Sequence, residues 1–201
     1  MFSGFITLFH HIMKSISFDS ANKMKSALLA LLLTGVMFAH AQSVKNTSYT
    51  TQTGEKVLRL ETVLPVDINE AWQLFTTDTQ LMKWIAPVAH IELKTGGYIL
   101  TNYDKAKSLT DSSSIKLDII NYLEREIMTL KVNLNSHFSP KVKAEDGNLQ
   151  EIIQFVYISP KETKVISSMV GWGKGEDWDK TYGFFERGNI WTYEEMLKIY
   201  R

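Results

Sequence analysis

Hydrophobic and polar residues alternate with a period of two along much of the chain between residues 56 and 170. Over residues 56–65 (KVLRLETVLP), Leu58, Leu60 and Leu64 share one face, which predicts a half-buried strand. Six more strands are predicted at residues 88–93, 98–103, 115–122, 127–134, 149–158 and 163–170. The turn residues at 94–97 and 159–161 predict antiparallel hairpins, and the polar residues 135–148 predict a long loop.

Two short helices are predicted between the first strand and the others. Asp67 can cap the first helix, with Glu70 three residues later as in a capping box. The second begins at Asp78, and Pro87 prevents its continuation. Apolar residues recur at helical spacing over residues 178–200, which predicts one long amphipathic helix. This order predicts an α+β fold, in which a curved antiparallel sheet wraps around a single C-terminal helix.

We expect the first 41 residues to form a leader rather than part of the fold. A basic segment begins at Met24, an apolar run follows at residues 27–38, and Ala39-His40-Ala41 supplies the small residues that a signal peptidase recognises. The apolar run is shorter than the roughly 20 residues of a membrane span. This order is typical of a Sec-type signal peptide at residues 24–41, cleaved after Ala41. We therefore expect a periplasmic or secreted protein with no membrane span after cleavage.

Residues 1–23 precede a second possible start at Met24, and we expect them to have no structural role. Translation can start at Met1 or at Met24. Residues 42–55 are rich in Ser, Thr, Asn and Gln and predict a flexible lead-in. The folded domain is then expected at residues 56–201.

The composition excludes several classes of partner and of reactive site. Lys+Arg and Asp+Glu both number 22, so no charge excess attracts nucleic acid or an anionic membrane. The chain contains no cysteine, which excludes disulfides, thiolate metal sites and thiol nucleophiles. His90 and His137 belong to no ligand pair and are interpreted as surface residues. We therefore expect no metal, no other cofactor and no identified catalytic residue.

Four motifs resemble the SRPBCC or helix-grip superfamily, which includes the START lipid-transfer domains and the birch pollen allergens. They are VLPVDINEAWQLF (residues 63–75), LMKW (81–84), GGY (96–98) and the segment from GWG to WDK (171–180). The nearest branch is the one named for the activator of heat-shock-protein (Hsp) ATPase. The resemblance extends over nearly all of residues 56–200.

The resemblance implies an apolar cavity between the sheet and the long helix, usually for a lipid-like or aromatic small molecule. An exported protein that binds such a molecule is the function expected. Members of the superfamily also include co-chaperones and enzymes. The alternatives are therefore a protein-interaction module of the Hsp ATPase activator type, or an enzyme that uses a cavity acid such as Glu92.

Aromatic and apolar side chains are expected to converge between the sheet and the long helix, where core packing and cavity lining both explain them. Asn189 differs, because it is a polar residue within the apolar stripe of the helix and must find a partner there. We predict a ligand contact for it. The predicted lining comprises Leu60, Trp84, Ile119, Leu130, Trp178, Tyr182, Phe185, Asn189 and Tyr193.

Phe184 and Trp191 lie seven residues apart, on the side of the helix that faces away from the sheet. A pair of exposed aromatic residues can mark a contact surface for a protein partner. The alternative is that they pack beneath the loop at residues 135–148.

The segment GWGKGEDWD at residues 171–179 superficially resembles a phosphate-binding loop. Glu176, Asp177 and Asp179 occupy the start of the following helix, where they would repel phosphate. The G-x-x-x-x-G-K-[ST] pattern is also absent. We therefore predict a tight turn in which the acidic residues cap the next helix.

Overall fold

The computed structural model describes residues 43–201. The predicted signal peptide, its cleavage point and the 23 residues upstream lie outside the described residues.

The described part of the chain forms one antiparallel sheet of nine strands, in the order β1-β3-β9-β8-β7-β6-β5-β4, with β2 also paired to β3. The strands are β1 (Lys45–Asn46), β2 (Tyr49–Thr50), β3 (Lys56–Leu64), β4 (Val88–Glu92), β5 (Tyr98–Asn102), β6 (Ile115–Leu123), β7 (Ile127–Val132), β8 (Gln150–Ser159) and β9 (Glu162–Val170). A register shift between Ile119 and Asn121 marks a bulge in β6, a feature that increases the local twist of a sheet.

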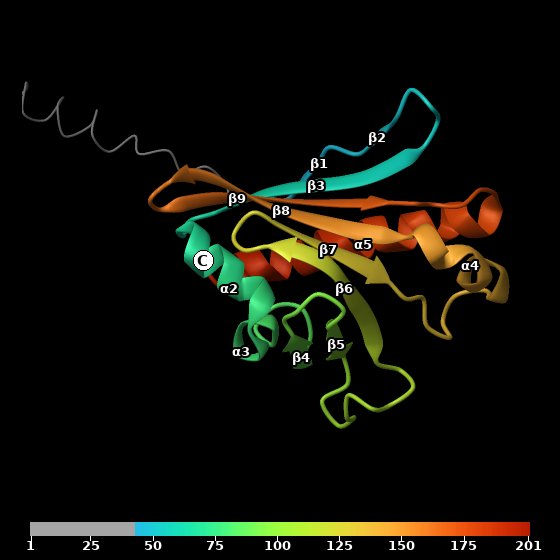
Figure 1. Cartoon of the computed structure of the whole chain (residues 1–201), viewed down its shortest axis with the longest axis horizontal. Helices are drawn as coiled ribbons and strands as arrows, with labels where there is room; N and C mark the ends of the chain where they lie inside the picture. The colour runs from blue at the N-terminus through green and yellow to red at the C-terminus, as the bar shows by residue number, and fades with distance from the viewer. Residues whose placement is uncertain (1–42) are drawn as a thin grey trace, which may run out of the picture. The chain divides into compact units, whose positions relative to one another are not determined.

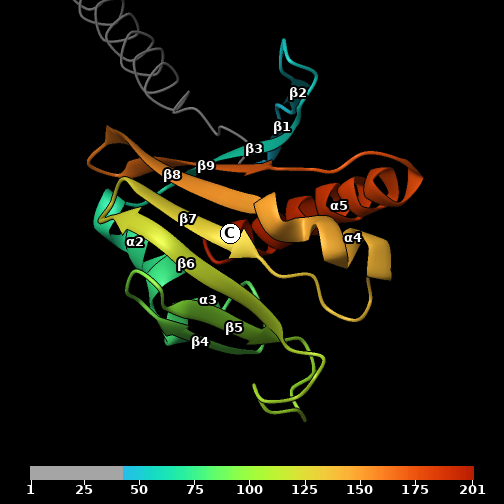
Figure 2. The same cartoon turned by 45° about the vertical axis from the view of Figure 1, so that its right-hand side comes forward.

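Helices α2 (Ile68–Thr76) and α3 (Asp78–Leu81) follow β3, and the long α5 (Glu176–Lys198) ends the domain. As predicted, Asp67 caps α2, because its Oδ1 accepts hydrogen bonds from the backbone nitrogens of Asn69 (2.8 Å) and Glu70 (3.0 Å). Helix α5 runs along one face of the sheet, while α2 and α3 lie towards one end of that face (Figure 1, Figure 2). The predicted α+β architecture is confirmed.

Two segments contain more regular structure than the sequence indicated. The loop predicted at residues 135–148 contains α4 (Pro140–Glu145) and η1 (Asp146–Asn148). Ser139 caps α4 and Pro140 occupies its first turn, a favourable start for a helix this short. In the predicted lead-in, β1 and β2 pair with β3.

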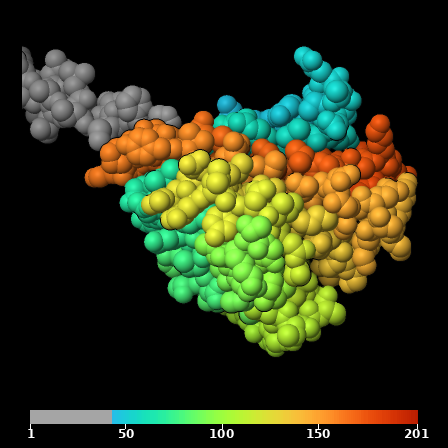
Figure 3. Space-filling model, in the orientation of Figure 1, coloured from blue at the N-terminus to red at the C-terminus, as the bar shows by residue number. Residues whose placement is uncertain are grey.

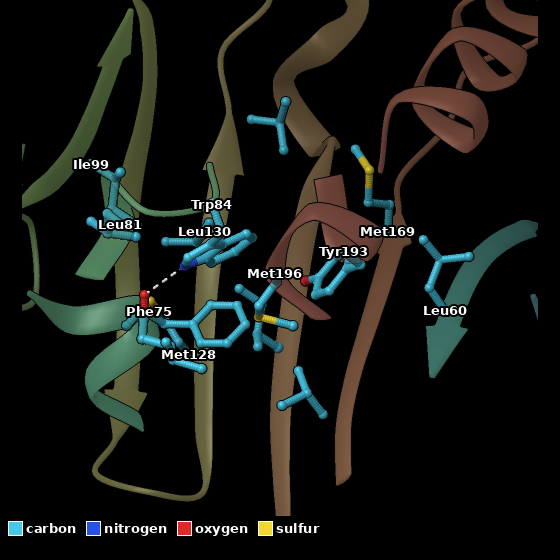
Figure 4. Close-up of a cluster of buried hydrophobic side chains, with 14 of the residues drawn as sticks. Leu60, Phe75, Leu81, Trp84, Ile99, Met128, Leu130, Met169, Tyr193 and Met196 are labelled. Carbon is cyan, nitrogen blue, oxygen red and sulfur yellow. Dashed lines mark hydrogen bonds between the residues drawn. The ribbon is translucent and has the colours of Figure 1, made fainter. Parts of the chain in front are cut away.

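The core lies between α5, α2 and the inward face of the sheet. Figure 4 shows part of it, where side chains from the strands meet Phe75, Trp84 and Tyr193. Trp84 is held in place because its indole Nε1 donates a hydrogen bond of 2.9 Å to the carbonyl of Leu74. The rings of Phe75 and Trp84 meet edge to face, with centroids 4.8 Å apart.

Candidate ligand-binding cavity

The core is not filled throughout. A cavity of about 570 Å³ lies between the middle of α5 and strands β5 to β9, with α2 and α3 at one side. Its walls are mainly apolar side chains of the strands and aromatic rings of the helices. Small-molecule sites in proteins have this size range and this kind of lining, with a few polar groups that orient the ligand.

Five of the nine predicted lining residues lie on the cavity wall: Trp84, Leu130, Phe185, Asn189 and Tyr193. Contrary to the prediction, the other four do not line it: Leu60, Ile119, Trp178 and Tyr182. Those five come from three elements far apart in the sequence, which the sheet and α5 bring together.

Trp178 lies in solid packing at the first turn of α5. It is 1% exposed, and its Nε1 donates a hydrogen bond of 2.7 Å to Oε2 of Glu145 on α4. Gly173 passes so close to the indole that a Cβ there would overlap the ring. The backbone of the turn before α5 therefore fills the space next to Trp178, where a cavity was predicted.

Leu60, Ile119 and Tyr182 also belong to packed regions. Leu60 is buried on β3, and Met169 separates it from the Trp84 side of the core (Figure 4). Ile119 is buried on β6. Tyr182 packs against Trp172, with ring centroids 4.9 Å apart, and carries the ammonium of Lys56 over its ring.

Two acidic residues line the cavity: the exposed Asp104, in the loop after β5, and Glu151 on the inward face of β8. The cross-strand neighbours of Glu151 on this face are Leu130 on β7 and Met169 on β9. Ser167 Oγ donates a hydrogen bond of 2.6 Å to its Oε1, and the Tyr193 hydroxyl donates one of 3.3 Å to the same oxygen. The carboxyl group is thus fixed in position within an apolar surrounding.

The surroundings of Glu151 set its electrostatics. Burial raises the pKa of its carboxyl group above the ordinary value, and the bonds from Ser167 and Tyr193 only partly oppose this shift. Burial and the charge of Glu151 likewise raise the pKa of Tyr193 well above its ordinary value. A carboxyl group with a raised pKa beside a cavity is typical of functional sites.

Glu92, the cavity acid of the enzymatic alternative, lies outside the cavity and pairs with Lys94 at 2.5 Å. Glu151 was not predicted, because both faces of the sequence QEIIQFVYIS carry apolar residues. The available signal was that Glu151 shares its face with Ile153 and Phe155, which are the buried residues of this strand.

Asn189 lies on the cavity wall, four residues before Tyr193 on α5. Its Nδ2 donates a hydrogen bond of 3.2 Å to the thioether sulfur of Met169, which is a weak acceptor. The amide of Asn189 was predicted to require a hydrogen-bond partner, and the partner it has in the structure is a weak one.

The open end of the cavity lies at the loops that follow β5 and β7. Tyr103, Lys107 and His137 line the cavity there and are exposed to solvent. The loop after β5 projects from the domain (Figure 1, Figure 3). Asn102 anchors it, because its Nδ2 donates hydrogen bonds to Ser113 Oγ (3.3 Å) and Ser114 Oγ (3.0 Å).

Phe184 lines the cavity and meets the ring of Phe138 edge to face, with centroids 5.3 Å apart. Phe138 belongs to the loop before α4, so Phe184 packs against this loop while its side chain stays 54% exposed. Trp191 is 52% exposed. His90, interpreted as a surface residue, is partly exposed and bonds Asp78 at 2.8 Å, a contact that helps to lower the pKa of Asp78 against the opposing effect of burial.

The glycine-rich segment is a tight turn, as predicted. Gly171 and Gly175 have φ angles of 83° and 100°, which favour glycine. Helix α5 begins after Gly175, and no side chain caps it, which corrects the prediction that the acidic residues do so. Asp179 instead forms an ion pair of 2.6 Å with Lys56 on β3.

Solved structures with a similar fold exist at low sequence identity. EF2215 from Enterococcus faecalis, described as a conserved protein of unknown function, matches with a TM-score of 0.57 and 12% identity over 78% of this chain and 77% of its own. Protein Ms6760 from Mycobacterium smegmatis matches with a TM-score of 0.54 and 12% identity over 78% of this chain and 96% of its own. The Aha1 dimer from Colwellia psychrerythraea matches with a TM-score of 0.50 and 13% identity over 71% of this chain and 98% of its own.

The chain has the helix-grip fold. This confirms the fold that the resemblance implied, and the Aha1 dimer is among the solved structures that share it. No family model matches the sequence, and no curated protein does. Because these identities are low, the comparisons show the fold and do not indicate which ligand or reaction the protein has.

Within residues 43–201, no group of three or more His, Asp or Glu side chains is placed to hold a metal ion. None of the helices described is both long and apolar enough to cross a membrane.

Proposed function

We propose that the helix-grip domain binds an apolar small molecule non-covalently in the cavity beneath α5. The observation that carries this proposal is the cavity of about 570 Å³ with its mainly apolar, partly aromatic wall. A monomer rarely keeps a void of this size without a use, because the lining atoms lose their packing contacts.

Native mass spectrometry of the purified domain tests this proposal. We expect a mass above that of the chain alone, which falls to the chain mass when the co-purified molecule is released by denaturation. A clean mass of the chain, together with failure of every apolar probe to bind, would argue against a small-molecule carrier. A protein captured under the same conditions would favour the interaction-module alternative.

A cavity-filling variant gives a sharper test. Leu117 lies on the cavity wall in β6, whereas Leu123 is 60% exposed at the end of the same strand. Leu117→Trp should place an indole in the cavity and abolish binding of pyrene, measured by its fluorescence. Leu123→Trp is the matched control and should bind pyrene as the wild type does.

We also propose that the protein is exported. The basic, apolar and small-residue segments between Met24 and Ala41 support this proposal. Amino-terminal sequencing of the protein from the periplasm or medium should begin at Gln42. Recovery of a mature chain that retains Met1 would overturn it.

A further inference from the structure

Glu151 holds an unusual place for a charged residue. It lies on the inward face of β8, and its neighbours on that face are apolar residues of β7 and β9. An acidic residue at such a position carries a desolvation cost that an apolar residue would not. Packing alone therefore does not explain why a glutamate is present.

The two oxygens of the Glu151 carboxyl group differ. Both donors, Ser167 Oγ and the Tyr193 hydroxyl, bond to Oε1. Within residues 43–201, the one fully buried side-chain oxygen or nitrogen without a partner is Thr62 Oγ1. Since Oε2 has no bond from these donors and is not sealed in the core, it must be reachable from the cavity that Glu151 lines.

Glu151 has no ion-pair partner within 4.0 Å among the described residues, and the basic side chains on the cavity wall, Lys107 and His137, lie in the loops after β5 and β7. The groups that bond Glu151 are both hydroxyls. A group supplied from the cavity would complete its hydrogen bonding.

We propose that the molecule held in this cavity is an apolar ring compound with a hydroxyl group, which hydrogen-bonds to Oε2 of Glu151. This inference rests on the proposed function and names the class of ligand. The rings of Phe75, Trp84 and Phe185 on the wall favour a flat ring system, because aromatic side chains stack on such molecules.

A hydroxyl group fits this site better than a carbonyl or an ammonium group. When Glu151 is protonated, the two bonds to Oε1 leave its proton on Oε2, where it can donate to the ligand oxygen. When Glu151 is ionised, Oε2 accepts from the ligand O–H instead. A carbonyl satisfies only the protonated form, and an ammonium only the ionised form, which burial disfavours.

Three fluorescent probes of matched shape test the inference: pyrene, hydroxypyrene and pyrenemethylammonium. Their dissociation constants are measured by fluorescence titration at neutral pH with the domain as it is exported. We expect hydroxypyrene to bind about fivefold to tenfold more tightly than pyrene, the difference typical of one neutral hydrogen bond. Pyrenemethylammonium should bind more weakly than hydroxypyrene.

Two variants of Glu151 locate the effect. Glu151→Gln can still donate and accept, so it should keep the preference for hydroxypyrene. Glu151→Leu should abolish it, since Oε2 is gone. Glu92→Gln, which alters an acid outside the cavity, is the matched control and should change none of the three constants. Thermal unfolding confirms that each variant is folded.

Equal affinities of pyrene and hydroxypyrene for the wild type would overturn the inference and leave the binding function standing. So would a preference for hydroxypyrene that survives Glu151→Leu. Tight binding of pyrenemethylammonium that Glu151→Gln abolishes would show a cationic ligand instead. If none of the probes binds, the inference fails; if the native mass is also that of the chain alone, the proposed function fails with it.

Discussion

At its first turn α5 places Trp178 against the body of the domain, and about four turns later it places Tyr193 there. Both rings are buried, and the polar tip of each bonds a glutamate, Glu145 for Trp178 and Glu151 for Tyr193. Around Trp178 the chain is close-packed, whereas Tyr193 borders a cavity of about 570 Å³. The same helix with the same kind of residue thus contributes both to a packed core and to the cavity wall.

The difference comes from what faces each ring. Opposite Trp178, the backbone of Gly173 approaches the indole, and α4 supplies the exposed Glu145. Opposite Tyr193, the sheet supplies the side chains of Glu151 and Ser167. The aromatic stripe therefore does not by itself locate a ligand site.

Removing the ring at the packed end should have the largest effect. Trp178→Ala should lower the free energy of unfolding by about 3–5 kcal/mol, since it empties a close-packed site. Denaturant unfolding measures this loss. Trp191→Ala, on the exposed side of the same helix, is the matched control and should change stability by about 0.5 kcal/mol or less. Equal losses for the two variants would contradict close packing around Trp178.

Adding one methyl group tests the same packing from the other side. Gly173→Ala should cost about 1–3 kcal/mol, because the new Cβ overlaps the Trp178 indole. Gly188 lies within α5 with no atom near its missing Cβ. Gly188→Ala should therefore stabilise the domain by about 0.5–1 kcal/mol. Chemical denaturation measures the free energy of unfolding of both variants. An unchanged stability of Gly173→Ala would contradict the close packing of Gly173 against the indole.

The pH dependence of stability tests the cavity end. Because the pKa of Glu151 is raised in the folded state, its contribution to stability is fully present below pH 4.5, the ordinary glutamate value, and is lost as pH rises through the folded-state pKa. Glu151→Gln removes this loss, so its advantage over the wild type should grow with pH above 4.5 and then level off. Thermal melts across this range measure the difference.

The acids with lowered pKa values, such as Asp118, act in the opposite direction and at lower pH, where stability falls as they become protonated. They are unchanged in Glu151→Gln, so their effect cancels in the comparison. A stability difference that stays constant from pH 4 to pH 8, within about 0.3 kcal/mol, would contradict a raised pKa of Glu151.

Among the substitutions inside the domain, only a small change in stability is expected for Asn189→Leu. The bond that this substitution removes goes to a thioether sulfur, so unfolding should change by less than about 1 kcal/mol. The affinity for hydroxypyrene should nevertheless fall about threefold to tenfold, because the cavity loses an amide group that can contact the ligand. Unchanged binding together with a more stable fold would show that Asn189 is not a ligand contact.

Local patterns were sufficient for most of the fold. The alternation in KVLRLETVLP, the Asp67 cap and the helical spacing after Trp178 depend on residues close in sequence, and each corresponds to β3, α2 or α5. The short helix α4 escaped this approach, because six residues carry too little periodicity to stand out from a polar loop.

The cavity depended on the tertiary structure. Sequence periodicity shows that Trp178 and Tyr193 share a face of α5, but not what lies opposite each ring. That is decided by contacts across 33 positions for Trp178 and Glu145 and across 42 for Tyr193 and Glu151. The sequence by itself determined the strands, the helices and the helix-grip order of elements, because these follow from short-range spacing. Only the tertiary structure decided that Trp178 is sealed and that Glu151 faces a cavity, because the strand register and the closing turn set where space remains.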